Sequence, residues 1–294
     1  MNFSRYYLAA LSAFAIWGFF SLVLKPLEVY ASLDILFYRV FSCAVLMLVV
    51  SSLFRKKVWK QNKEIFKGMP FSQKRKVVLL TLGGGVFLTA NWFFFIYVMN
   101  HINIKAASFA YLVCPIMTTV LAYFILKEKL SKWQWAAVLL SVISCLLLSF
   151  NNLADALYSL VVALSYALYL VSQRKNSELD RFLLLTFQVL FSALILLPFY
   201  PHYSGSLPTS AFFYGSILLI AILFTIIPLF LNLYALQRVN SSTMGILLYI
   251  NPLINFILAI CYFGEKINKF QIISYSLIFL SILIFNEQHI FRKR

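Results

Sequence analysis

Long apolar runs separated by short polar segments recur along the whole chain. Between Ala106 and Leu126 there is no charged residue, and three charged residues, Lys127 to Lys129, then follow together. A run of about 20 apolar residues has the length that an α-helix needs to cross the bilayer core, where lipid offers the backbone no hydrogen-bond partners. The pattern predicts an all-α integral membrane protein with ten transmembrane helices. Their predicted ranges are 6–24, 33–54, 77–98, 104–126, 132–150, 153–172, 182–199, 211–235, 241–263 and 270–286.

The composition agrees with this class. Hydrophobic residues make up 62% of the 294 residues and charged residues 12%, whereas a soluble domain has about 25% charged residues. The four cysteines all lie within predicted spans and form no CxxC motif, so we interpret them as small packing residues. The first span follows Arg5, and no small-residue cleavage site lies at a suitable distance, so we expect this span to be retained.

The net charge of +16 is distributed unevenly. If the spans alternate from a cytoplasmic N-terminus, twenty Lys and Arg residues fall in cytoplasmic segments and four in external ones, and Arg39 alone lies within a span. This excess is the positive-inside pattern, which predicts that both termini are cytoplasmic. The charge therefore predicts topology and not nucleic-acid binding, because no segment is long enough to fold into a basic soluble domain.

The longest polar segment covers residues 55–76 and holds nine of the basic residues. Apolar residues recur in it at helical spacing, which predicts an amphipathic helix. They are Val58, Trp59, Ile65, Phe66 and Met69. We expect this helix to lie on the anionic inner leaflet, and a solvated basic linker is the alternative.

The chain contains an internal repeat. Residues 115–134 match residues 252–271 without gaps at seven of twenty positions, at a shift of 137 residues. The identities include proline, glutamate, lysine and glutamine, which match by chance less readily than leucine does. We predict two repeats, at 1–150 and 151–294, within one integrated membrane domain. Each holds five predicted spans, an odd number, so the second repeat is inverted in the membrane, an arrangement typical of transporters.

Pro115 and Pro252 are repeat partners near the middle of their predicted spans. A proline frees a backbone carbonyl and bends a helix, which a membrane tolerates where a neighbour or a cavity accommodates the freed group. Small and polar residues lie near each proline, most of them on one face at helical spacing. They are Ser108, Thr118 and Ala122 in one span, and Gly245, Asn251, Asn255 and Ala259 in the other. We expect the two faces to meet each other or to line a cavity, and small-residue packing is the alternative.

Two further repeat partners, Glu128 and Glu265, follow these spans at predicted membrane boundaries. Ser131 and Gln134 have the spacing of a capping box that opens the next helix, and residues 268–271 have a similar pattern. We interpret both glutamates as parts of structural turns. A role in ion coupling is the alternative.

Arg39 lies six residues into the predicted span 33–54, about 9 Å from its outer end. A charged residue at this depth is a candidate for function. We expect it to bind an anionic group of the substrate or to pair with Asp34 or Glu28 as an external gate, and snorkelling to the interface is the alternative. No Asp, Glu or His lies near the middle of a predicted span, which argues against a central protonating acid.

Aromatic residues make up 18% of the chain. Those on spans that carry other polar residues are candidates for a substrate cavity, because ring faces bind apolar bodies and cations. The candidate cavity residues are Trp17, Arg39, Asn91, Trp92, Tyr97, Tyr111, Pro115, Thr118, Tyr166, Tyr169, Tyr234, Tyr249, Asn251, Pro252 and Asn255. For any single aromatic residue, packing in the core or at the membrane interface is the alternative.

Seven segments spread over nearly the whole chain carry a family resemblance. They are "IWGFFSLVLK" (16–25), "LDILFYRVFS" (33–42), "NWFFFIYVMN" (91–100), "ASFAYLVCPI" (107–116), "LKEKLSKWQW" (126–135), "TIIPLFLNLYALQR" (225–238) and "GILLYINPL" (245–253). Together they resemble the ten-span EamA-type members of the drug/metabolite transporter superfamily, most closely the RarD-like branch. Two positions depart from that branch: Tyr38 stands where a histidine is expected, and "LVSQRK" (170–175) replaces a leucine-arginine-lysine ending.

The resemblance implies a bacterial inner-membrane protein that moves small metabolites, often amino acids or related compounds and often outward. It also implies a central cavity lined by spans 1, 3, 4, 6, 8 and 9, with spans 5 and 10 packed at the side.

These observations predict a secondary transporter that moves amino-acid-like or related amphipathic solutes by alternating access. The chain has no GxxxxGK[ST] loop for ATP, and we predict no catalytic residue, metal site or cofactor. An integral-membrane enzyme, a non-transporting receptor, and an importer or exchanger of a larger metabolite are the alternatives. The predicted partners are a small-molecule substrate and the lipid bilayer, and both a monomer and an oligomer are compatible with the sequence.

Overall fold

The computed structural model describes residues 5–101, 104–149, 153–205, 207–262, 264 and 269–287. Within these ranges all regular elements are helices. Their bounds are α1 (Arg5–Gly18), α2 (Phe20–Leu24), η1 (Lys25–Leu27), α3 (Ser32–Val49), η2 (Val50–Phe54), α4 (Lys56–Gly68), α5 (Phe71–His101), α6 (Ile104–Leu126), α7 (Lys132–Ser149), α8 (Leu153–Lys175), α9 (Arg181–Leu196), α10 (Tyr200–Tyr203), α11 (Ala211–Ala221), η3 (Ile222–Ile226), α12 (Ile227–Ala235), α13 (Ser241–Leu247), α14 (Ile250–Cys261) and α15 (Lys269–Phe285).

Five segments of the described chain are long and apolar enough to cross a membrane. They are Arg5–Leu27, Ser32–Phe54, Phe71–Phe95, Ala211–Ala235 and Ser241–Leu258. Their surfaces expose large apolar side chains, which in a bilayer contact lipid instead of water. The prediction of an all-α protein with membrane-spanning helices is therefore confirmed.

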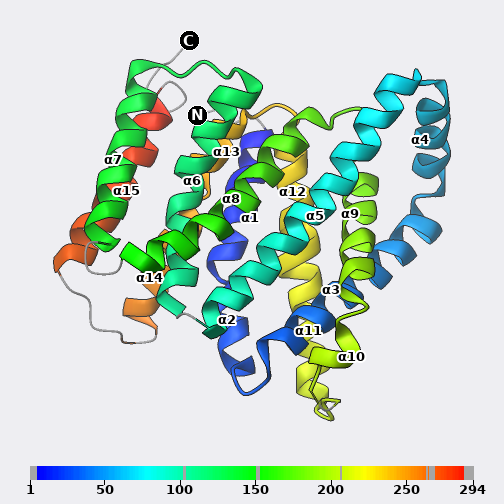
Figure 1. Ribbon diagram of the computed structural model, residues 1–294, viewed down its shortest axis with the longest axis horizontal. Helices are drawn as coiled ribbons and strands as arrows, with labels where there is room; N and C mark the ends of the chain where they lie inside the picture. The colour runs from blue at the N-terminus through cyan, green and yellow to red at the C-terminus, as the bar shows by residue number, and fades with distance from the viewer. Residues whose placement is uncertain are drawn as a thin grey trace.

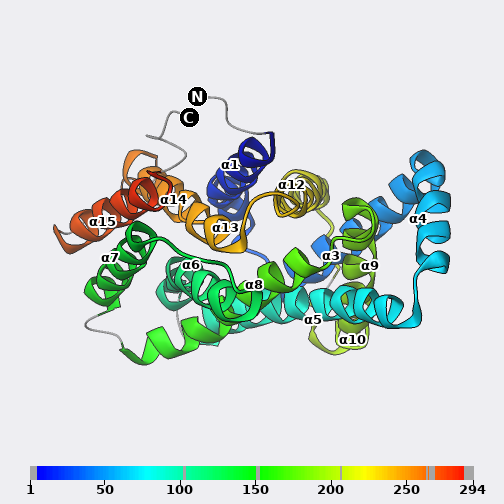
Figure 2. The ribbon, with the colours of Figure 1, turned by 90° about the horizontal axis from the view of Figure 1, so that it is seen from above.

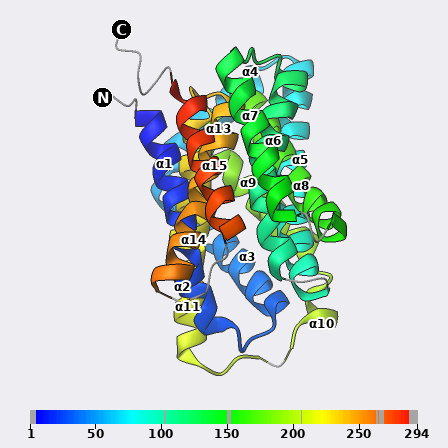
Figure 3. The ribbon, with the colours of Figure 1, turned by 90° about the vertical axis from the view of Figure 1, so that its left-hand side faces the viewer.

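The long helices run between the two ends of one bundle (Figure 1). Seen from above, α5, α6, α7 and α8 form one layer and α1, α12, α13, α14 and α15 form another (Figure 2). Between the layers, α13 packs on α6 and α15 on α7. The start of α1 and the end of α15 lie at the same end of the bundle (Figure 3). The ends of α6 and α8 and the starts of α7, α9 and α13 also lie there (Figure 1), and we call this the α1 end.

The pair formed by α7 and α15 lies at one side of the bundle (Figure 1). The two helices begin at Lys132 and Lys269, which are 137 positions apart, and they run in opposite directions. Two buried serines of α7 reach α15: Ser141 donates to the Ser281 hydroxyl at 3.1 Å and Ser144 to the Ser274 carbonyl at 2.9 Å. This placement agrees with the expected position of spans 5 and 10 beside the main bundle.

The contact between α6 and α13 depends on a glycine. A Cβ atom at Gly245 would lie 2.8 Å from the Thr118 Cβ and 3.2 Å from the Pro115 carbonyl oxygen, so only glycine permits this approach. Thr119 donates to the same Pro115 carbonyl at 2.9 Å. The two small-residue faces therefore meet each other here, and the Thr118 side chain is fully buried between them.

The turn after α6 contains a residue in the left-handed conformation and a capping box. Lys127 has a left-handed φ of 58°, and Gly264, its repeat partner 137 positions later, has a φ of 66°. The predicted capping box at the start of α7 is formed, since Ser131 N–H donates to Gln134 Oε1 at 2.9 Å and Gln134 N–H donates to Ser131 Oγ at 3.2 Å.

Glu128 lies in the same turn and binds the start of α13. Its carboxylate accepts hydrogen bonds from the backbone N–H groups of Ser241 and Ser242, at 2.8 and 3.0 Å, and from the Ser242 hydroxyl. The first N–H groups of a helix have no partner within it, and Asn240, the N-cap residue, makes no side-chain cap. Glu128 thus caps a helix of the other half of the chain. Glu265 lies outside the described residues.

The amphipathic helix predicted within residues 55–76 is present as α4, and its apolar face packs on α9. The Trp59 ring lies 5.6 Å from that of Phe187, and Met69 and Phe66 join a cluster with Leu184. Ile65 is half exposed. The apolar face of α4 is therefore only partly covered by protein, and Trp59 and Ile65 stay exposed.

We expect Lys127→Gly to stabilise the protein. A side chain in the left-handed region costs about 1 kcal/mol, which glycine avoids. The midpoint of thermal unfolding in detergent should rise by about 2–4 °C. Lys129→Gly is the matched control, because it removes a lysine from the same turn at a residue without positive φ. A lower midpoint for Lys127→Gly than for the control would contradict the assignment.

We expect Glu128→Ala to destabilise the protein by about 1–3 kcal/mol, because it leaves the first N–H groups of α13 without their acceptor. The free energy of unfolding, measured by denaturant titration, checks this. Glu64→Ala removes an exposed carboxylate that pairs only with Lys67, at 3.3 Å, and should have no measurable effect. Equal effects of the two substitutions would argue against the capping role.

Candidate functional site

The candidate site lies beside a proline and a π-helical turn in the membrane segment 211–235. Pro228 has no N–H, so the carbonyl of Phe224, four residues earlier, loses its helical partner. The backbone widens into the π-helical η3 at this point. The indole N–H of Trp17, on α1, donates to the freed Phe224 carbonyl at 2.8 Å. The proline thus determines where Trp17 is held.

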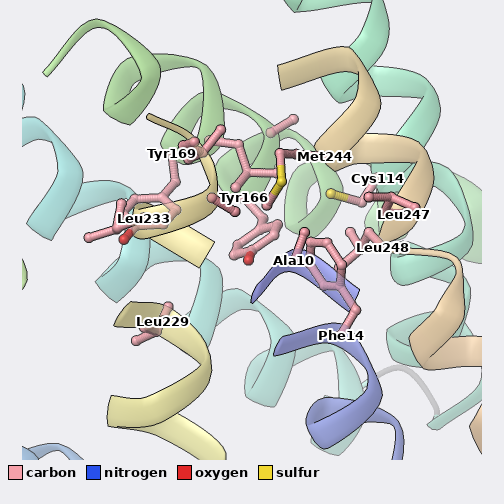
Figure 4. Packing of buried hydrophobic residues seen from close by; sticks show 14 of the residues in the cluster. Ala10, Phe14, Cys114, Tyr166, Tyr169, Leu229, Leu233, Met244, Leu247 and Leu248 are labelled. Carbon is pink, nitrogen blue, oxygen red and sulfur yellow. The ribbon is translucent and has the colours of Figure 1, made fainter. Parts of the chain in front are cut away.

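A row of aromatic side chains continues from Trp17 into α8. The Tyr166 ring lies edge-on to Trp17 at 6.1 Å, and the Tyr169 ring follows at 5.8 Å. The Tyr166 hydroxyl accepts a hydrogen bond from Asn232 Nδ2 at 2.9 Å. Both tyrosines lie in the packed cluster between α1, α8, α12 and α13 (Figure 4). The candidates Trp17, Tyr166 and Tyr169 are therefore brought together.

A buried polar network extends this row toward the α1 end. Tyr169 donates to Gln188 Oε1 at 3.3 Å, and Gln188 Nε2 donates to Gln173 Oε1 at 2.6 Å. A Cβ at Gly84 would overlap both glutamine amides, so glycine makes room for them. Arg181 Nη1 donates to the backbone carbonyl of Gln173 at 3.1 Å.

Of this network only Tyr169 was among the predicted candidates; the glutamines Gln173 and Gln188 and the arginine Arg181 were not. The signal present in the sequence was a set of amides within or at the end of the predicted spans. They are Gln173, Gln188 and Asn232.

Arg39 lies on the other side of the aromatic row. Its guanidinium carbon is 5.0 Å from the centre of the Trp92 ring, and it interacts electrostatically with Tyr111 of α6 and Cys43 of α3. Its Nε atom is buried without a hydrogen-bond partner. The guanidinium contacts Trp92 inside the bundle, so Arg39, Trp92 and Tyr111 form a second group of candidates.

The expected pairing of Arg39 with Asp34 or Glu28 is not formed. The Asp34 carboxylate accepts the Gly205 backbone N–H at 3.0 and 3.3 Å, and a Cβ at Gly205 would lie 2.9 Å from one of its oxygens. Glu28 lies 3.9 Å from Lys25. The sequence did not indicate that a loop glycine far along the chain would engage Asp34.

The two matched prolines differ in local structure. Pro115 lies within the continuous helix α6, whereas the segment that contains Pro252 tightens into i→i+3 hydrogen bonds at Leu248 and Tyr249, between α13 and α14. There the Asn251 N–H donates at 3.1 Å to the Leu248 carbonyl, the group that Pro252 cannot reach.

The remaining candidates on α5 and α14 make contacts within the bundle. Asn255 Nδ2 donates to Asn251 Oδ1 at 2.7 Å. Asn91 donates to the Val162 carbonyl of α8 at 3.0 Å.

Three candidates lie away from these groups. Tyr97 is 44% exposed and lines a separate apolar groove of about 590 Å³ between α3, α5 and α9. Tyr234 stacks on Tyr6 at 4.8 Å, near the start of α1. Thr118 is buried in the contact between α6 and α13. Helical spacing placed these residues on polar spans but did not fix which neighbour each one faces.

Comparison with known proteins agrees with this architecture. A solved crystal structure superposes with a TM-score of 0.74 at 15% identity and covers 94% of both chains, so the two share a fold. Among relatives, the uncharacterized transporter YojE of Bacillus subtilis is 29% identical and covers 96% of this chain and 93% of its own. Protein RarD of Escherichia coli is 27% identical (98% and 95% covered), and protein RarD of Streptomyces exfoliatus is 30% identical (92% and 85% covered).

The family match covers both halves of the chain. The model of the EamA-like transporter family matches residues 4–150 and again residues 154–286. The resemblance to EamA-type and RarD-like proteins is thereby confirmed. Because the two matches together span nearly the whole chain, this protein belongs to the EamA-like transporter family.

Proposed function

We propose that this membrane transporter is a secondary transporter that moves small, amino-acid-like or related amphipathic solutes outward across the bacterial inner membrane. The observation that carries the proposal is the family match, which occurs in two consecutive copies. A duplicated membrane unit supplies two similar halves, and a substrate site between such halves is typical of secondary transporters.

We propose that the chain forms ten spans as two inverted five-helix repeats, at 1–150 and 151–294. Three features 137 residues apart support this arrangement. Lys127 and Gly264 share the left-handed conformation, α7 and α15 begin at equivalent residues and run in opposite directions, and the prolines coincide. An inverted repeat requires equivalent helices to run in opposite directions through the membrane.

Alternating access follows from a difference between the halves. The segments around Pro115 and Pro252 are equivalent in sequence, but α6 is one helix, whereas the backbone at Leu248 and Tyr249, between α13 and α14, stays helical and tightens into i→i+3 hydrogen bonds. Two equivalent halves in different conformations can exchange those conformations at little net cost, and the exchange opens the opposite side of the membrane. Glu128, which joins the end of α6 to the start of α13, holds the α1 end together in this structure.

The substrate would bind between α1, α3, α5, α6 and α8, where the two groups of candidates lie. Trp17, Trp92, Tyr111 and Tyr166 present ring surfaces there, which suit an apolar or planar solute. The α1 end carries the excess of basic residues, so we place it in the cytoplasm. We propose no cofactor and no partner other than the solute and the lipid bilayer.

Purified protein in liposomes should move at least one solute. A mixture of amino acids, organic acids, amines and phosphate esters is offered outside, and the liposome contents are analysed by mass spectrometry. Specific accumulation above protein-free liposomes is the expected result, with saturation as concentration rises. If no solute accumulates and none shifts thermal unfolding, the transport proposal loses its support.

Replacing both matched prolines should impair transport more than folding. In Pro115→Ala/Pro252→Ala the backbone regains two N–H donors, so the tightened turn before α14 can relax to regular α-helix and the two halves lose their alternative conformations. Solute flux per inserted molecule should fall. Pro208→Ala, in a loop, is the control and should keep the wild-type flux. Unchanged flux in the double variant would contradict the role of the prolines.

A further inference from the structure

We infer that Arg39 binds an oxyanion group of the transported solute, a carboxylate or a phosphate ester. The inference rests on the proposed transport function and assigns the class of substrate. It starts from a charge that no carboxylate of the described residues neutralises.

Arg39 places that charge inside the membrane-spanning part of the bundle. It lies seven residues after the start of α3, about 10 Å along the helix axis. Its guanidinium lies against the Trp92 ring, and its Nε atom is buried. A cation at such a site is costly unless something opposes its charge, which makes it a candidate for ligand binding.

No carboxylate opposes Arg39 within the described part of the chain. Asp34, one helical turn away from it, is held by the Gly205 backbone N–H, and Glu28 lies beside Lys25. The ionisable groups that interact with Arg39 are the Cys43 thiol and the Tyr111 phenol. Both groups are ordinarily neutral at pH 7, so neither supplies a counter-charge.

Other arginines of this protein do have acceptors for their N–H groups. Arg55 lies 3.1 Å from Asp180. Arg181 is also buried, but it donates to the backbone carbonyls of Gln173 and Asn176 at the end of α8, where the helix dipole is negative. Arg181 keeps its Nε and Nη2 atoms buried without acceptors, as Arg39 does with Nε, but two backbone carbonyls bind its Nη1 atom. Arg39 differs in lying against an aromatic ring, with no carboxylate of the described residues beside it.

The geometry around Arg39 favours a two-oxygen anion. A guanidinium that lies on an aromatic ring uses its face for that contact, and its N–H donors point outward from its edges. Carboxylates and phosphates bind such an edge through two parallel hydrogen bonds. The Trp92 ring beside it provides apolar surface for the rest of the solute.

Four probes of similar size test this assignment. They are phenylacetate, its neutral analogue phenylacetamide, the cation phenethylamine, and benzyl phosphate. Each is titrated into the purified full-length protein while the midpoint of thermal unfolding is followed. We expect phenylacetate or benzyl phosphate to raise the midpoint and the other two to leave it unchanged, and the stronger of the two anions identifies the oxyanion. Equal midpoints with all four probes would overturn the inference.

Substitutions at Arg39 then connect the effect to this side chain. Arg39→Gln should weaken binding of the effective anion about tenfold or more, because charged hydrogen bonds are lost. Arg39→Lys keeps the positive charge but loses the paired N–H donors of the guanidinium. Its affinity for the anion should therefore lie between those of the wild type and of Arg39→Gln. Unchanged anion affinity in Arg39→Gln would overturn the inference.

The stability of the ligand-free protein separates binding from a structural role. Arg39→Met removes an unopposed charge, so its midpoint should equal or exceed that of the wild type. Arg181→Met is the matched control: it removes a buried arginine that caps α8 and should lower the midpoint. A comparable fall for Arg39→Met would assign Arg39 to the fold instead of to a ligand.

The liposome measurements distinguish failure of this inference from failure of transport. If a neutral or cationic solute accumulates and Arg39→Gln leaves its flux unchanged, transport stands and the anion site is overturned. If the anionic probes bind through Arg39 but no solute accumulates, the site stands and the transport proposal fails.

Discussion

The structure depends on the requirement that every backbone hydrogen-bonding group inside a membrane find a partner within the protein. Wherever a helix begins or its regular hydrogen bonding is disturbed, a specific group forms a hydrogen bond with the backbone group left without a helical partner. The carbonyl freed by Pro228 receives the indole N–H of Trp17, and the carbonyl that Pro252 cannot reach receives the N–H of Asn251. The first N–H groups of α13 bind the Glu128 carboxylate. The same contacts that satisfy the backbone thus hold side chains from distant helices in fixed positions.

This requirement also explains how a duplicated sequence can adopt two local structures. Helix α6 keeps its continuity around Pro115, where Thr119 donates to the Pro115 carbonyl. The equivalent segment around Pro252 tightens into i→i+3 hydrogen bonds before α14. Both arrangements satisfy the backbone, so neither is strongly preferred by sequence alone. Two halves can exchange conformations only if the two conformations have similar free energies. A large free-energy preference for one conformation would leave the other unpopulated.

The sequence predicted those features that follow from local patterns. Apolar runs predicted the membrane helices, and spacing predicted the capping box of α7. The repeat predicted one contact between distant elements, that of the faces around Thr118 and Gly245. Most other contacts were not predicted, because the period of a helix places a residue on a face without naming the partner of that face. Trp59 on α4, expected at the leaflet, is 41% exposed and also contacts Phe187, a partner that the spacing did not name. Tyr97 and Thr118 lie on polar spans but face a lateral groove and a helix contact. The buried amides Gln173 and Gln188 were not predicted, because the spacing gave no sign that they lie beside Tyr169.

The positive charge of Arg39 has no carboxylate beside it among the described residues. A buried arginine is stabilised when fixed acceptors bind part of it, as the Gln173 and Asn176 carbonyls bind Nη1 of Arg181. Asp34, five residues before Arg39, binds the Gly205 backbone N–H instead, and no carboxylate of the described residues pairs with Arg39. A stable scaffold would gain by replacing such a cation with an apolar side chain, because an unopposed buried charge costs more than it contributes. A site that must bind an anion and then release it gains from keeping the cation without a fixed carboxylate partner. A built-in carboxylate would compete with the solute, whereas an aromatic ring supports the guanidinium without occupying its hydrogen-bond donors.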